Sequence, residues 1–268
     1  QQDSASGGWS VPPKNSPTPS LPAITGLALT GMLLKPGMDQ HDPAVVNATR
    51  YILSLRKPDG GIYDAILPSY NTAICLSALA RFNDPTTKAA IKPAQDFLKS
   101  LQFGEAATTS GPAAKETGKV DKDHAFYGGV GYGRSGRPDL SNTAFFIEAL
   151  RDSGVPADDQ AIQRALVFLK RVQMDDRIND MPYAKGSRQG GFIYSTSESK
   201  DKVGVGQSEV RGIPVEETLD DGTKVSRLRA YGSMTYAGFK SYVYADLPRD
   251  DVRVTAAYDW IRRNYTVQ

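Results

Sequence analysis

"KPDGGIY", residues 57–63, decides the fold, because its double glycine followed by a large apolar residue returns along the chain. The other copies are "SGGWS" (6–10), "YGGVGY" (127–132) and "QGGFIY" (189–194). Glycine adopts a positive φ without a Cβ clash, so each copy marks a sharp turn. The residue that follows (Trp9, Ile62, Val130 or Phe192) can pack back against the helix ends. Four such turns indicate an internal repeat.

Two sets of helices alternate around these turns. The A helices, 44–56, 90–102, 161–173 and 253–265, align without gaps and bring Tyr51, Phe97, Phe168 and Trp260 into register on one face. The less charged B helices, 69–82, 140–154 and 232–247, align on Thr72, Thr143 and Thr235, and 21–34 is a looser fourth member. We therefore predict an all-α array of helical hairpins with about eight main helices.

The array is predicted to form a single domain over residues 1–268. Its repeats run roughly over 1–35, 42–82, 86–154 and 158–247, and a partial repeat covers 250–268. Two long loops, about 103–138 and about 175–229, interrupt it, and loops of that length in a compact domain are usually functional. A short hairpin is expected in the second loop, around Asp221 and Gly222.

Composition excludes several classes of function. The 32 basic residues are balanced by 30 acidic ones, and no run of five like charges occurs, so neither nucleic acid nor an acidic membrane surface is an expected partner. No stretch approaches the roughly 18 apolar residues of a membrane span, so no transmembrane segment is expected. Cys75 is the only cysteine and cannot form an internal disulfide.

The repeat pattern carries a family resemblance. An aromatic residue, a leucine and a terminal glutamine stand in "FLKSLQ" (97–102) and "FLKRVQ" (168–173), and Asp-Gly-Gly stands in "KPDGGIY". This pattern resembles the repeats of squalene and oxidosqualene cyclases and protein prenyltransferase β subunits, over nearly the whole chain. Residues 131–154 and 233–245 look most like bacterial prenyltransferase/squalene-oxidase-repeat proteins of unassigned activity. The resemblance implies an α/α toroid with outer A and inner B helices, and suggests a bacterial cell-envelope or exported setting. Two arrangements stay open: the chain is part of a longer, here incomplete toroid, or the first B helix packs against the last A helix to complete a fourth hairpin.

The catalytic residues of the characterised family members find no match here. Squalene-hopene cyclases protonate an alkene with an Asp-x-Asp-Asp cluster, and the nearest candidates are Asp121, Asp123 and Asp175, for which solvated positions in polar loops are the favoured interpretation. Protein prenyltransferases hold zinc with Asp, Cys and a His that precedes a threonine of an inner helix. Asn71 occupies that position before Thr72, so we expect no metal and no cofactor.

Tyrosines and amides make up the candidate ligand site. In a toroid, the A-to-B loops and the N-terminal ends of the B helices surround the mouth of the cavity. These segments carry Tyr63, Tyr70, Asn71, His124, Tyr132, Arg134, Asn142, Tyr194, Tyr231 and Tyr236. Such a set suits an amphipathic or sugar-like ligand. For the asparagines, a role as helix N-caps is the alternative interpretation.

Two classes of function stay open. In the first, a non-catalytic repeat domain binds a lipid, a polyprenoid, a glycan or a partner protein, or associates with itself through an open helical face. In the second, the chain is a triterpene (squalene-hopene-type) cyclase or a related polyprenoid-processing enzyme. The lack of a proton donor or zinc site favours the first class, whereas the resemblance favours the second.

Overall fold

Eight α-helices dominate the structure, a computed structural model that describes residues 1–12, 16–105, 119–133, 137–196 and 214–266. The B helices are α1 (Pro22–Leu33), α3 (Pro68–Leu79), α5 (Leu140–Asp152) and α7 (Gly232–Tyr244). The A helices are α2 (Pro43–Ser54), α4 (Pro85–Ser100), α6 (Gln160–Val172) and α8 (Val252–Asn264). The predicted helices are confirmed, and only α4 begins well before its expected start.

Aspartate side chains set the starts of the A helices. Asp42, Asp84, Asp159 and Asp251 each accept a hydrogen bond from a backbone N–H of the first turn. Asp84 accepts from Thr86 and Thr87 and is followed by Pro85, which is pre-organised for the first helical position, and this explains the early start of α4.

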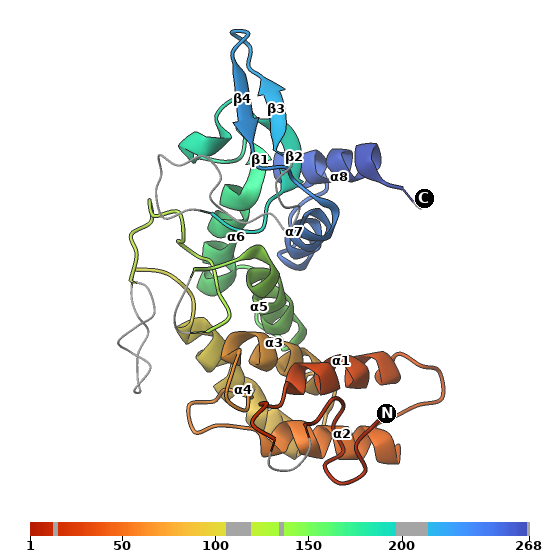
Figure 1. The fold of residues 1–268 in the computed structure, drawn as a ribbon. Coiled ribbons are helices and arrows are strands. Elements are labelled where there is room, and N and C mark those ends of the chain that lie inside the picture. The colour runs from red at the N-terminus through yellow and green to blue at the C-terminus, as the bar shows by residue number, and fades with distance from the viewer. Residues whose placement is uncertain (13–15, 106–118, 134–136, 197–213, 267–268) are drawn as a thin grey trace.

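The helices form a bent double row. The B helices pack side by side in the order α1, α3, α5, α7, and each A helix packs on the B helix that precedes it in the chain. Figure 1 shows the row bent into a crescent, with the B helices along the concave side and α1–α2 and α7–α8 as its two arms. The hydrophobic core lies between the two rows and contains, for example, Leu76 and Leu98.

The double-glycine turns hold one repeat against the next. The first glycine of each pair (Gly7, Gly60, Gly128 and Gly190) has a positive φ, as predicted. A Cβ at Gly128 would lie 1.8 Å from the carbonyl oxygen of Arg164 on α6, and one at Gly129 would lie 2.7 Å from the ring of Phe168. The aromatic residue shared by the A helices therefore packs on the second glycine of the turn before it.

Two polar contacts recur with the turns. The Thr143 hydroxyl accepts a hydrogen bond from the N–H of Val130 at 3.0 Å, and Thr25, Thr72 and Thr235 do the same in their repeats. Gln102 Nε2 donates to the carbonyl oxygens of Gly128 (2.9 Å) and Ala161 (2.8 Å), and Gln2 and Gln173 make the equivalent pair of bonds. These side chains satisfy buried backbone groups that no helix or sheet pairs.

Two small antiparallel sheets correct the all-α prediction. β1 (Gln173–Asp175) pairs with β2 (Arg188–Phe192), and β3 (Val215–Thr218) pairs with β4 (Lys224–Arg227). A short 3-10 helix, η2 (Pro182–Ala184), lies between β1 and β2. The expected hairpin around Asp221 and Gly222 is confirmed as β3–β4, which projects from one end of the crescent (Figure 1). The ladders pair backbone groups of a long connection that would otherwise be unsatisfied.

No helix in the described part of the chain has the length and apolar character needed to cross a membrane. Cys75 is buried in α3, and burial raises the pKa of its thiol. It packs as the small buried hydrophobe that its position in a B helix indicates.

Candidate ligand-binding site

Four aromatic side chains meet near the N-terminal ends of α3 and α5. Tyr70 of α3 lies edge-on to Phe145 of α5, with ring centroids 5.4 Å apart, and is 6.4 Å from the ring of Tyr132. The hydroxyl oxygens of Tyr132 and Tyr194 are 3.2 Å apart. We call Tyr70, Tyr132, Phe145 and Tyr194 the aromatic cluster.

The repeat turns place the two loop tyrosines. Tyr132 and Tyr194 each stand two residues after the apolar residue of a double-glycine turn. The carbonyl oxygen of Tyr132 accepts from the N–H of Ser69 (3.2 Å), and that of Tyr194 accepts from the N–H of Leu140 (2.8 Å). Each tyrosine is thus attached to the first turn of the neighbouring B helix, whose N–H groups lack partners within the helix.

The tyrosine side chains of the cluster are partly accessible. Burial raises the pKa of Tyr194, and the neighbouring Tyr132 and Asp139 raise it further. Burial also raises the pKa of Tyr70. Tyr132 is 44% exposed, and the guanidinium carbon of Arg137 lies 5.9 Å from the centre of the Tyr194 ring. Neutral hydroxyls both donate and accept hydrogen bonds, so they can orient the polar end of a ligand.

A buried carboxyl group lies next to the cluster. Asp139 is 2% exposed and caps α5, accepting from the backbone N–H and the side-chain amide of Asn142, both at 2.8 Å. Burial raises the pKa of Asp139, although hydrogen bonds from Asn142 and Tyr194 act in the opposite direction. Neither Asp139 nor Phe145 is among the site residues predicted from the sequence. The position of Asp139 directly before a B helix was the available signal.

The two asparagines of the B helices differ in their contacts. Asn71 Oδ1 accepts from the N–H of Ala23 at 3.0 Å, and its amide donates to Ile66 and Leu67, so this residue joins α3 to α1. Asn142 Oδ1 is buried and has no hydrogen-bond partner among the described residues. Neither asparagine is an N-cap, because Leu67 and Asp139 occupy those positions.

Other predicted site residues lie apart from the cluster. Tyr63 stacks on Phe97 at 5.7 Å and donates its hydroxyl hydrogen to Asp59. His124 Nδ1 accepts from the N–H of Phe126 at 3.1 Å.

The two tyrosines predicted near the last B helix lie at the other end of the row. Tyr231 directly precedes α7, and Tyr236 is 48% exposed on that helix. Arg134 lies outside the described residues.

The three candidate acids have different surroundings. Asp121 and Asp123 are exposed in the loop before the third double glycine. Asp175 is not in a solvated loop: it is buried in β1, and its oxygens accept from Arg177 at 2.8 and 2.6 Å. This placement corrects the expectation of a solvated loop position for Asp175. The pairing of β1 with β2 buries its carboxylate, and the ion pair with Arg177 offsets the cost of that burial. Within the described ranges, no three His, Cys, Asp or Glu side chains gather closely enough to hold a metal ion.

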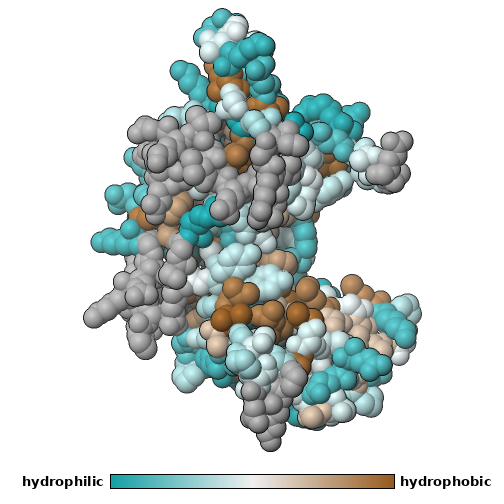
Figure 2. Space-filling view, viewed as in Figure 1, coloured by the Kyte–Doolittle hydropathy of each residue, from teal (hydrophilic) through white to brown (hydrophobic). Residues whose placement is uncertain are grey.

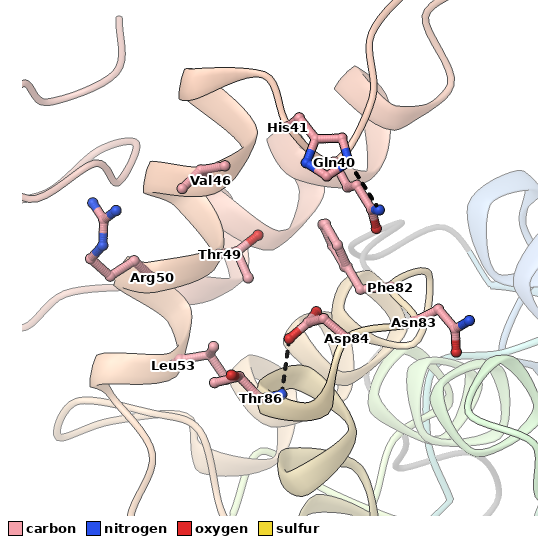
Figure 3. A pocket seen from close by; sticks show the side chains of 10 residues that line it. All are labelled: Gln40, His41, Val46, Thr49, Arg50, Leu53, Phe82, Asn83, Asp84 and Thr86. Carbon is pink, nitrogen blue, oxygen red and sulfur yellow. Dashed lines mark hydrogen bonds between the residues drawn. The ribbon is translucent and has the colours of Figure 1, made fainter.

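A second concavity lies on the outer side, away from the predicted residues. This cavity, of about 580 Å³, separates α2 from the turn that leads into α4 (Figure 3). Val46, Leu53 and Phe82 supply apolar lining, and the carboxylate of Asp84 points to the N–H of Thr86. Hydrogen bonds from Thr87 lower the pKa of Asp84, so this carboxylate serves the start of α4. The cavity is a groove between two repeats.

Comparison of the chain with protein-family models gave no match, and comparison with curated proteins gave none either.

Proposed function

We propose that the chain is a repeat domain of the squalene cyclase and prenyltransferase type, which binds an amphipathic ligand at the aromatic cluster without a catalytic acid or zinc ion of its own. The observation that carries the proposal is the convergence of three tyrosines and a phenylalanine from two B helices and two repeat turns. Aromatic rings bind apolar groups at low entropic cost, and their hydroxyls fix orientation.

The surroundings of the cluster support an apolar ligand with a hydroxyl-bearing end. Figure 2 shows hydrophobic side chains gathered over α1 and α3 on the concave side of the crescent. Ile66, which lies just before α3, is 42% exposed. The buried Asn142 Oδ1 adds an acceptor that a ligand hydroxyl or a bound water would satisfy. A polyprenoid alcohol therefore fits these surfaces better than a glycan, whose many hydroxyls would face the apolar part.

A polyprenoid-cyclising enzyme is the second candidate. Asp139 favours it, because a buried carboxyl group with a raised pKa beside aromatic rings is suited to protonate an alkene. Both oxygens of Asp139, however, accept hydrogen bonds from Asn142, which ties the carboxyl group to the start of α5. Binding is therefore the function that we favour.

The test is a titration with farnesol, an apolar isoprenoid chain with one hydroxyl group, followed by intrinsic fluorescence. We expect Tyr70→Ala and Tyr194→Phe each to weaken binding about tenfold, because one removes ring contact and the other a hydrogen bond. Tyr265→Ala is the matched control, since Tyr265 is 68% exposed and lies outside the cluster, directly after α8. Equal affinity of all four proteins would refute the proposed site.

Native mass spectrometry with a solvent extract separates the two candidates. A co-purifying polyprenoid recovered unchanged supports binding. Conversion of squalene to a cyclic product that disappears in Asp139→Asn would instead establish the enzyme.

A further inference from the structure

We propose that two copies of this chain associate head to tail, with the outer edge of α7–α8 in one copy packed on the outer edge of α1 in the other. The α7–α8 edge consists of Tyr236, Phe239, Val243 and Tyr258, and the α1 edge consists of Leu27 and Leu34. The B helices are repeats of one unit, so equivalent positions in them make equivalent contacts.

Each B helix faces its successor through positions one and eight residues after the shared threonine. In α1 the first position is Gly26, whose Cβ would lie 3.1 Å from Ile74 of α3. In α5 the second position is Arg151, which donates to the carbonyl oxygen of Tyr244 in α7 at 2.6 Å. The corresponding residues of α7 are Tyr236 and Val243, which are 48% and 57% exposed.

Each B helix faces its predecessor through positions two and nine residues after the threonine. Phe145 of α5 contacts the Tyr70 ring of α3 from the first position. Tyr244 of α7 reaches Glu148 of α5 from the second, with 3.4 Å between the oxygen atoms. The corresponding residues of α1 are Leu27 and Leu34, which are 50% and 69% exposed. The α7–α8 edge is thus the side of a B helix that contacts a following helix, and the α1 edge is the side that contacts a preceding helix.

The last A helix, α8, also has an exposed groove where the other A helices contact the next repeat. In the groove of Figure 3, one wall is the α2 face with Val46, Thr49 and Arg50, and the other is the turn at Phe82, Asn83 and Asp84. The gap-free alignment of the A helices places Thr255, Tyr258 and Asp259 of α8 at the equivalent positions. These residues line a larger groove of about 810 Å³, formed by α7, α8 and the turn between them.

A second copy could supply the helix and the turn that cover the equivalent groove between earlier repeats. Its α1 would take the place that α3 has beside α1. Its turn before Asp42 would take the place of the turn before Asp84, since both aspartates cap an A helix. Figure 1 shows both arms on the same side of the crescent, so two copies that face each other can use both edges at once. Head-to-tail contacts that close in this way give a finite assembly, here a dimer.

Sedimentation velocity over a concentration series tests the proposal. We expect the wild-type chain to dimerise, and Val243→Glu or Leu27→Glu to weaken dimerisation at least about tenfold, because each places a charge in an apolar contact. Ile66→Glu is the matched control: Ile66 is a 42% exposed apolar residue outside both edges. Circular dichroism confirms that each variant is folded, which is expected because these side chains are exposed.

Mixing the two variants tests the head-to-tail arrangement itself. Val243→Glu leaves the α1 edge intact and Leu27→Glu leaves the α7–α8 edge intact, so an equimolar mixture should form a heterodimer through one good contact. Native mass spectrometry identifies this heterodimer by its mass. A monomeric wild-type chain, a Leu27→Glu variant that dimerises as tightly as the wild-type chain, or a mixture without heterodimer would each overturn the proposal.

Discussion

Alanine at Gly128 should destabilise the protein far more than alanine at Gly154, although both glycines have a positive φ (+83° and +93°). At Gly154 the new Cβ meets no heavy atom within 4 Å. The substitution there costs only the conformational strain of an L-residue in the left-handed region, about 1 kcal/mol. Gly154 therefore serves as a control that isolates this strain.

At Gly128 the substitution adds a steric clash to the same strain. The new Cβ would lie 1.8 Å from the carbonyl oxygen of Arg164, whereas ordinary contact begins at 3.4 Å, so the turn and α6 must separate by about 1.6 Å (3.4 minus 1.8). That movement also stretches the hydrogen bond from the Gln102 amide to the Gly128 carbonyl oxygen. Overpacking adds about 2 kcal/mol and a weakened buried hydrogen bond about 1 kcal/mol, so we expect a total loss of about 4 kcal/mol.

Urea denaturation followed by far-UV circular dichroism measures both costs. The midpoint should fall much further for Gly128→Ala than for Gly154→Ala, with similar m-values, because the surface exposed on unfolding is almost unchanged. Unfolding free energies of the two variants that agree within about 0.5 kcal/mol would refute the conclusion that the double-glycine turn packs directly on the next A helix.

Three further outcomes are expected. Thr143→Val should cost about 1–3 kcal/mol in urea denaturation, because it leaves the buried N–H of Val130 without its acceptor, and Thr143→Ser should restore most of the loss. The hydrogen bond from Arg253 lowers the pKa of Asp251 below its usual 3.8, so this carboxylate stabilises the fold above that value and the contribution is lost as pH falls through the lowered pKa. Thermal unfolding should therefore show Asp251→Asn less stable than wild type at neutral pH and equal to it once both are acidified, and a constant difference would contradict this reasoning. Gln173→Leu should cost more than Thr143→Val, because it leaves the carbonyl oxygens of Gly190 and Arg253 and the buried hydroxyl of Tyr242 without their partner, and an unchanged urea midpoint would exclude this role.

Three of the residues predicted for the candidate site owe their positions to the nearest turn or helix start. Tyr70, Tyr132 and Tyr194 were predicted because each lies beside such a point, and the structure brings them together. Asn71 was placed in the same set, but its contact with Ala23 depends on the packing of α1. Phe145 was missed because only the crossing of α3 and α5 brings its ring to Tyr70.

The sequence by itself determined the helices, their alternation and the sharp turns, because helical periodicity, aspartate caps and glycine conformation act over a few residues. Tertiary structure alone decided which surfaces these elements share. The double glycine reads locally as a turn, yet Gly128 packs on α6, which follows more than thirty residues later. A hydrophobic pattern indicates that a helix face is buried but not which other surface covers it, since the hydrophobic effect is non-directional. The small sheets, the surroundings of Asp139 and the two exposed edges of the crescent are consequences of that packing.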